Sequence, residues 1–273
     1  MVLAACMITV IGCGSGHVAT ILTPEERFQQ AKALYDDEDY LEAINEFRII
    51  TLQHPGSEFA DDAQFYLGEC RFQRGEYLLA THEYGELKRN MPASSLVPDG
   101  QFKLGLSYYH LAPKPSLDQQ STKKAIDELQ TFVEYYPSHQ QASSAEAKIQ
   151  ELNTRLAEKS YETARLYSKM EDYKAAIFYF DDVIEKFHDT KFAPLAYLGK
   201  VEALIARKKY DEADSELNKF ISLFPNSVLR NEADRLKQKV SGEMDRARQM
   251  SGERSGRRQG PGSDPGVSSS VRP

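Results

Sequence analysis

The chain has 273 residues, 41% of them hydrophobic, and a formal net charge of -7 at pH 7. This composition supplies enough apolar side chains for a sizeable core. It argues against a nucleic-acid partner, because binding to phosphates needs a clustered basic face and no stripe of Lys or Arg precedes the C-terminal tail.

The chain begins with a short apolar run, Val2–Ile11, which is too short to span a bilayer. The run ends at Gly12-Cys13, and an apolar run followed by small residues indicates an export signal. The sequence around Cys13 resembles the lipobox of bacterial lipoproteins. This resemblance implies that residues 1–12 are a signal peptide, that Cys13 is lipidated with palmitate among its acyl chains, and that Gly14-Ser15 favours sorting to the outer membrane. The alternative is an apolar N-terminus with an ordinary thiol.

The first helix is expected to begin at Thr23-Pro24-Glu25-Glu26, after a linker at residues 13–22. A threonine suits the N-cap, and a proline suits the first helical position because its missing N–H has no partner there. Two acidic residues in the first turn interact favourably with the positive end of the helix dipole.

A helical hairpin pattern then recurs five times between residues 23 and 240. In each copy a small residue precedes a large apolar residue by four positions. These pairs are Ala43 and Phe47, Ala80 and Tyr84, Ala125 and Leu129, Ala176 and Phe180, and Ala213 and Leu217. In four copies a proline follows twelve positions after the small residue, and it ends the second helix because it cannot donate the next helical hydrogen bond. The pattern resembles the tetratricopeptide repeat family, which implies an all-α solenoid of five helical hairpins with a C-terminal capping helix.

Two interruptions lengthen the intervals between copies. Residues 112–118 extend the turn of the third copy and predict a protruding loop. Between Pro137 and Tyr173 there is no glycine or proline and apolar residues keep helical spacing, which predicts one long helix. We expect this helix to divide the repeats into an N-terminal group, residues 23–137, and a C-terminal group, residues 138–240. Residues 241–273 are rich in Gly, Ser, Pro and Arg and are expected to form a disordered tail.

The sequence shows no pattern typical of catalysis or of a metal or cofactor site. Its six histidines are scattered, without the spacing of paired metal ligands, and it has no Gly-rich phosphate loop. Cys70 lies among apolar neighbours and is expected to be a small core residue, with no disulfide. We therefore expect a protein that is not an enzyme and that needs neither metal nor cofactor.

Aromatic residues recur at two positions of the first helix in each of the first three repeats. By the register of the tetratricopeptide family, both positions line the concave groove, and because they are seven residues apart they share one helix face. The six residues are Phe28, Tyr35, Phe65, Phe72, Phe102 and Tyr109. They predict a groove for an extended peptide with aromatic side chains, in which Lys32, Lys103 and His110 fix a carboxylate or a carbonyl. The alternative is that these rings belong to the core, as aromatic residues at helical spacing often do.

The segment Leu156–Tyr167 and its continuation to Ala176 resemble the entry to the fourth repeat in the lipoprotein subunits of the bacterial outer-membrane β-barrel assembly complex. The resemblance implies a scaffold that is anchored by lipid to the periplasmic face of the outer membrane. It implies that the N-terminal repeats bind the aromatic-ending targeting signals of unfolded outer-membrane proteins. The C-terminal repeats would bind the periplasmic domains of the β-barrel insertase subunit.

Two other functions remain open at this stage. One is a periplasmic tetratricopeptide lipoprotein that coordinates peptidoglycan synthesis with envelope constriction, although such proteins usually carry an N-terminal coiled coil and this chain has no heptad run before residue 23. The other is a lipid-anchored hydrolase or solute-binding protein, which would need a substrate-sized pocket with convergent polar groups.

Overall fold

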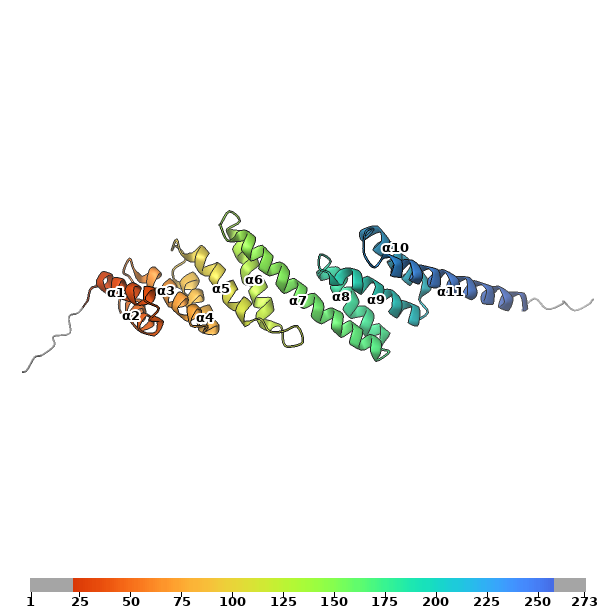
Figure 1. Ribbon diagram of the computed structural model, residues 1–273, viewed down its shortest axis with the longest axis horizontal. Helices are drawn as coiled ribbons and strands as arrows, with labels where there is room; N and C mark the ends of the chain where they lie inside the picture. The colour runs from red at the N-terminus through yellow and green to blue at the C-terminus, as the bar shows by residue number, and fades with distance from the viewer. Residues whose placement is uncertain (1–21, 258–273) are drawn as a thin grey trace, which may run out of the picture. The chain divides into compact units, whose positions relative to one another are not determined.

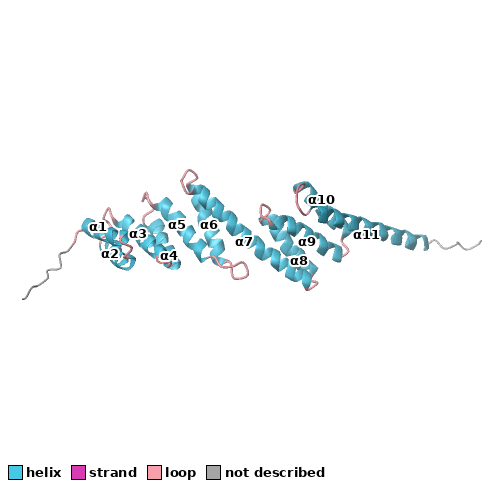
Figure 2. Ribbon diagram, in the orientation of Figure 1, coloured by secondary structure: helices cyan, strands magenta, loops and turns pink. Residues whose placement is uncertain are grey.

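The computed structural model describes residues 22–257, which form eleven α-helices and no strand (Figure 1). The helices are α1 (Pro24–Asp36), α2 (Tyr40–Gln53), α3 (Ala60–Gln73), α4 (Tyr77–Asn90), α5 (Val97–Leu111), α6 (Gln120–Tyr135), α7 (Ala142–Lys169), α8 (Tyr173–Lys186), α9 (Phe192–Ala206), α10 (Tyr210–Leu223) and α11 (Arg230–Arg257). Loops join consecutive helices into hairpins (Figure 2). The expected all-α architecture of five hairpins and a final helix is confirmed. The expected signal peptide and Cys13 lie outside the described residues.

The described chain divides into two compact units between Gly100 and Gln101. Unit 1 contains α1 to α4 and the start of α5, and unit 2 contains the rest of α5 and α6 to α11. This division lies within α5, on the N-terminal side of the boundary that the sequence predicts after Pro137. The boundary after Pro137 stays a prediction.

The repeat anchors form the centre of each hairpin, as the spacing predicts. All five anchor alanines are 0% exposed, and the apolar residues four positions later are at most 2% exposed. Alanine allows the two helices of a hairpin to approach closely, and the larger residue fills the space between hairpins. The first helix begins as expected, because the Thr23 hydroxyl accepts a hydrogen bond from the Glu26 amide and the Glu26 carboxylate accepts one from the Thr23 amide.

Both interruptions of the repeat spacing lie in unit 2. The long helix between Pro137 and Tyr173 is confirmed as α7, which has 28 residues. The loop between α5 and α6 is held by the buried Gln119, whose amide donates to the carbonyl oxygens of Lys114 at 2.9 Å and Leu117 at 3.0 Å. The Lys159 ammonium on α7 donates to the same Leu117 carbonyl at 2.5 Å. The loop therefore packs on α7 with a defined conformation.

The last helix is longer than the sequence indicates. We expect a disordered tail from Ser241, but α11 continues to Arg257, which corrects the start of that tail. Residues 241–257 contain no proline to end the helix, and Met244 packs against the apolar cluster that contains Val240 and Leu217. Residues 258–273 lie outside the described part of the chain.

Gly68 provides a test of the close helix packing in unit 1. A Cβ atom at this position would lie 2.4 Å from the Tyr84 ring, which is 0% exposed. We expect Gly68→Ala to lower the free energy of unfolding by about 1–3 kcal/mol, because the buried ring has no room to move. Gly85→Ala is the matched control, since a Cβ there meets nothing within 4 Å. Because alanine favours a helix over glycine, we expect the control to be stabilised by about 0.5–1 kcal/mol. Equal stabilities of the two variants in urea unfolding would contradict this packing.

Candidate functional site

Four of the six predicted groove residues lie in unit 1, where they form one aromatic surface. Phe28 and Tyr35 lie on α1, Phe65 and Phe72 lie on α3, and all four are half-buried. Three of these rings contact the ring of Tyr66, with centroid distances of 6.1 Å for Phe28, 5.1 Å for Tyr35 and 5.8 Å for Phe65. These four rings therefore form a connected network that keeps part of its surface exposed. Phe72 lies seven residues after Phe65 on the same face of α3 and contacts Tyr77. We call Phe28, Tyr35, Phe65, Tyr66 and Phe72 the unit 1 aromatic surface.

Tyr66 is the member of this surface that the repeat register does not identify. Its ring also stacks on the fully buried Phe47 at 5.5 Å, with an angle of 14° between the ring planes. The residues at the same position in the first and third repeats are Gln29 and Lys103, so no aromatic row marks it in the sequence. In the sequence, the one indication that Tyr66 belongs to this surface is its position directly after Phe65.

Lys32 places a positive charge at the edge of the aromatic surface. Its ammonium lies 5.3 Å from the ring centroids of both Tyr35 and Tyr66, within the range of cation–π attraction. It also forms an ion pair with Asp36. The side chain is 29% exposed, so the ammonium can reach an anionic group of a ligand while its stem stays against the rings.

The surroundings of Tyr35 and Tyr84 in unit 1 raise the pKa of both hydroxyls. Burial, and then the charge of Glu69, raise the pKa of Tyr35 to about 12. The Tyr84 hydroxyl donates a hydrogen bond to the Glu69 carboxylate at 2.5 Å, and burial raises the pKa of Tyr84 well above its usual value. Tyr35 thus offers a ligand an apolar ring face and a neutral hydroxyl.

The two predicted residues of unit 2 have different surroundings. Phe102 is 5% exposed and packs against Phe132 with a centroid distance of 5.3 Å, so its ring lies in the core, the alternative left open for this set. Tyr109 is half-buried, and its hydroxyl donates to the Glu151 carboxylate at 2.7 Å. The Lys148 ammonium lies 4.4 Å from the Tyr109 ring centroid. Two charged side chains of α7, Glu151 and Lys148, therefore contact Tyr109.

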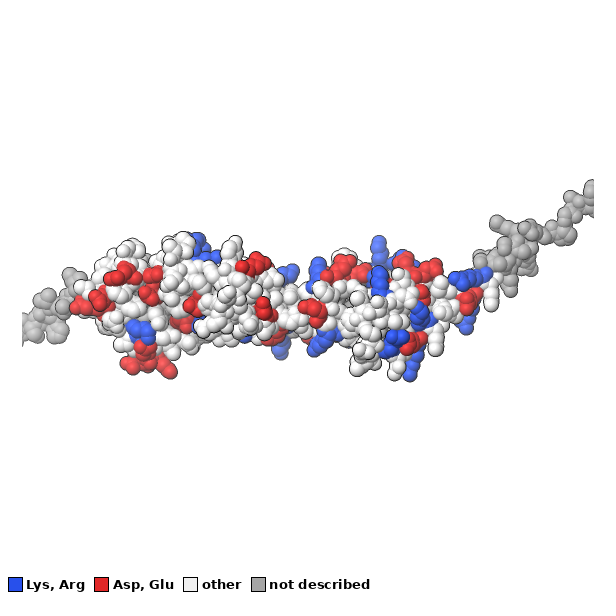
Figure 3. All heavy atoms as spheres, turned by 90° about the horizontal axis from the view of Figure 1, so that it is seen from above, with Lys and Arg blue, Asp and Glu red and all other residues white. Residues whose placement is uncertain are grey.

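Other features of the described chain concern metal ligands, membrane spans, the free thiol and the distribution of charge. Among residues 22–257 no cluster of His, Cys, Asp or Glu has metal-ligand geometry, and none of the helices has the length and apolar character that a bilayer span requires. Cys70 is 0% exposed, as expected for a core residue, and burial raises the pKa of its thiol to about 12. On the face shown in Figure 3, basic side chains are interspersed with acidic ones and form no continuous stripe.

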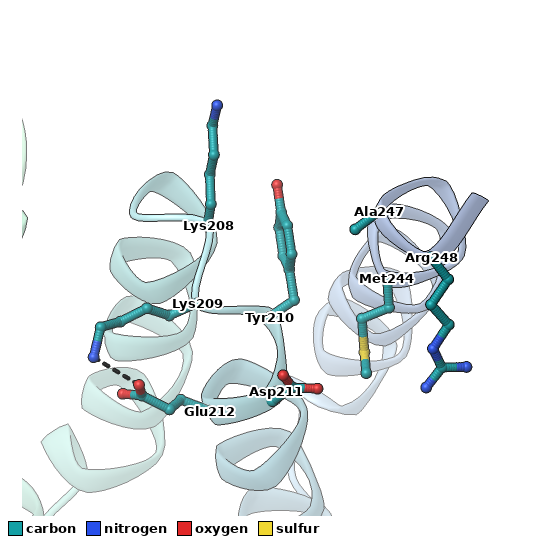
Figure 4. Close-up of a pocket in the computed structure, with 8 residues that line it drawn as sticks. All are labelled: Lys208, Lys209, Tyr210, Asp211, Glu212, Met244, Ala247 and Arg248. Carbon is teal, nitrogen blue, oxygen red and sulfur yellow. Dashed lines mark hydrogen bonds and ion pairs between the residues drawn. The ribbon is translucent and has the colours of Figure 1, made fainter. Parts of the chain in front are cut away.

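A hollow of about 680 Å³ opens between the start of α10 and the exposed part of α11. Tyr210, Met244 and Ala247 contribute its apolar lining, and Lys208 and Arg248 contribute charge. Figure 4 shows that Lys208 and Tyr210 project in one direction and Arg248 in another. The charged groups of this hollow do not converge on one point, as the polar groups of a hydrolase or solute-binding site would.

Comparisons with known proteins identify a protein family and a tetratricopeptide repeat in this chain. A model of a family described as outer membrane lipoprotein matches residues 22–207, and a tetratricopeptide repeat model matches residues 195–227. The outer membrane protein assembly factor BamD of Rickettsia prowazekii is 27% identical over 209 residues, which cover 77% of this chain and 83% of that protein. The assembly factor BamD of Caulobacter vibrioides is 26% identical over 210 residues, with coverages of 75% and 69%. Among solved structures, the TPR2AB domain of yeast Sti1 is similar, at 17% identity and a TM-score of 0.40 over 80% of this chain and 82% of that chain.

Proposed function

This chain belongs to the outer membrane lipoprotein family, and from this we propose that it is a scaffold subunit of the machinery that assembles β-barrel proteins in the outer membrane. Both curated relatives are outer membrane protein assembly factors and neither is named as an enzyme, in agreement with the expectation of a non-enzymatic protein. Since the matches extend over three quarters of this chain, the proposal concerns the repeats as a whole.

The observation that carries the proposal is the unit 1 aromatic surface. Four of its five rings are in contact with one another and all five are half-buried, so the surface presents apolar area to a ligand in its folded conformation. Rings of this kind bind other aromatic side chains with large contact areas and favourable edge-to-face geometry. We infer that the surface binds the aromatic-ending targeting signals of unfolded outer-membrane proteins, with the Lys32 ammonium available to the terminal carboxylate.

The remaining parts of the chain would hold the scaffold in place. The C-terminal repeats, within residues 138–240, would dock the periplasmic domains of the β-barrel insertase subunit. Cys13, as the lipidated first residue, would anchor the protein to the periplasmic face of the outer membrane, because several acyl chains together hold a protein firmly on a bilayer. A coordinator of peptidoglycan synthesis is the second candidate, and family membership favours the assembly role over it.

Photo-crosslinking in living cells tests this function. A photoreactive phenylalanine analogue in place of Phe72 is expected to cross-link to unfolded outer-membrane β-barrel proteins, because the Phe72 side chain lies on the surface that binds them. The matched control carries the same analogue in place of Phe178, which is 68% exposed on α8 of unit 2. Cross-links from Phe72 to peptidoglycan enzymes alone would contradict the assembly role and support the second candidate.

A further inference from the structure

Unit 2 contains a hollow of about 220 Å³ to which the proposed function gives no specific ligand. It lies between α7, α9 and the start of α11. Its lining includes the apolar or aromatic side chains of Tyr161 and Leu198 and four charged side chains, those of Arg165, Lys169, Glu202 and Glu232. None of them belongs to the unit 1 aromatic surface.

The charges around this hollow are separated by sign. Arg165 and Lys169 come from α7, whereas Glu202 comes from α9 and Glu232 from α11. Arg165 already has a partner outside the hollow, since its guanidinium forms an ion pair with Glu162 at 3.0 Å. Within residues 22–257, neither Glu202 nor Glu232 has a hydrogen-bonding or ion-pair partner. The Lys169 ammonium likewise has no ion-pair partner in the described part of the chain, so both walls of the hollow carry a charge that is available to a ligand.

The two carboxylates affect one another. Partial burial raises the pKa of Glu202, the negative charge of Glu232 raises it further, and the positive charge of Lys239 opposes the shift. Both the loss of water and the like charge make the ionised form of Glu202 unfavourable. Both side chains remain accessible to a ligand, and a cation placed between the two carboxylates would offset the repulsion between them.

The floor of the hollow is apolar. The Tyr161 ring lies in contact with Phe180 at a centroid distance of 5.9 Å, and Leu198 is 4% exposed. Gly199 brings the α9 backbone close to the Phe180 ring, where a Cβ would be 2.4 Å away. Lysine and arginine have long aliphatic stems that pack along such surfaces while the charged end reaches a carboxylate. The chain's own Arg165 guanidinium already lies 5.9 Å from the Tyr161 ring centroid, which shows that this ring attracts such a group.

We propose that this hollow binds an arginine or lysine side chain of an extended polypeptide segment from another protein. The stem lies on Tyr161 and Leu198, and the charged end lies between Glu202 and Glu232. The basic wall of Arg165 and Lys169 receives an acidic or carbonyl group of the same segment. A polypeptide fits better than a small cation, because an inorganic ion would use neither the apolar floor nor the basic wall. The inference does not depend on the unit 1 aromatic surface, and its test uses neither the insertase nor an aromatic-ending peptide, although the hollow lies on the repeats that are proposed to dock the insertase.

A pair of blocked peptides tests this site on the unmodified full-length chain. One is a fluorescently labelled Ser-Leu-Arg-Leu-Ser, and the other contains citrulline, the neutral analogue of arginine, in place of the arginine. We expect the arginine peptide to bind about tenfold or more tightly than the citrulline peptide in fluorescence anisotropy at neutral pH, because only its charged group forms charge-assisted hydrogen bonds with the carboxylates. Equal affinities, or no binding of either peptide, would overturn the proposal.

Variants locate the binding site. Glu202→Gln with Glu232→Gln is expected to reduce the affinity for the arginine peptide to that for the citrulline peptide, without lowering the melting temperature, because the substitutions remove a repulsion. Glu134→Gln is the matched control, since Glu134 is exposed on α6 and does not line the hollow. If the double variant binds the arginine peptide normally, the site is wrong. If the double variant fails to fold, the single variant Glu232→Gln replaces it, and unchanged binding by that variant likewise overturns the site.

Discussion

Phe47→Ala lowers the free energy of unfolding of unit 1 by about 3–5 kcal/mol, the cost expected when a fully buried aromatic side chain leaves a cavity. Phe47 is 0% exposed and is the large apolar residue of the first repeat anchor. Its ring contacts Phe28 on α1 at 5.7 Å and Tyr66 on α3 at 5.5 Å. One side chain thus joins three consecutive helices, and a repeat protein transmits such a loss to the neighbouring repeat.

Chemical denaturation followed by circular dichroism measures this loss, and hydrogen exchange assigns it to unit 1. Leu52→Ala on the same helix is the matched control, because Leu52 is 73% exposed and its removal should change the free energy by less than about 0.5 kcal/mol. Protection of amides in α8 to α10 should stay as in the unmodified chain. A loss of protection there equal to that in α1 to α3 would show that the chain unfolds as one cooperative unit.

The repeat anchors can be predicted from the sequence because each one is fixed by local geometry. Two helices joined by a short turn must approach closely at one point, and a small residue is required there whatever the rest of the chain does. Ala43 and its four equivalents are all buried for this reason. Helix α7 is predictable in the same way, since the absence of Gly and Pro over its length is a local property.

The exposure of the aromatic rows depends on neighbours and is less predictable. Phe65 and Phe102 occupy the same repeat position, yet Phe65 is half-buried and Phe102 is 5% exposed. Phe102 packs against Phe132, which follows its anchor by seven positions, whereas the equivalent residue in unit 1 is the smaller Leu87. The register of a helix predicts the direction of a side chain, but the residues packed around that side chain decide how much of it is exposed.

The two interruptions in the repeat spacing have a common structural role in unit 2. The loop after α5 reaches the lengthened part of α7, where Lys159 and Arg155 donate to the carbonyl oxygens of Leu117 and Ala112. Spacing identifies each insertion separately, but it contains no information that the two are in contact. Their contact explains why the loop has a defined conformation although no repeat anchor lies within it.

Phe65→Ala with Phe72→Ala should weaken the binding of an aromatic-ending peptide to the full-length chain by about thirtyfold or more. Aromatic residues at the centre of an interface commonly contribute about 2 kcal/mol each when truncated, and the effects of neighbouring rings are not additive. Phe65 contacts Tyr66 at the centre of the aromatic surface, and Phe72 contacts Tyr77 at 5.2 Å on its other side. The double substitution therefore removes contact area from two places on one surface, while the anchor residues remain.

Fluorescence anisotropy with a labelled peptide ending in phenylalanine measures this effect, and circular dichroism shows whether helicity is kept. Phe178→Ala is the matched control, because it removes an aromatic ring that is 68% exposed in unit 2 and should leave the affinity unchanged. A second peptide with a C-terminal amide in place of the carboxylate separates the contribution of Lys32, whose ammonium lies beside the rings. Helicity lost together with binding would mean that Phe65 and Phe72 are core residues. Helicity and binding both retained would mean that the peptide binds elsewhere, and in either case the unit 1 aromatic surface would not be the recognition site.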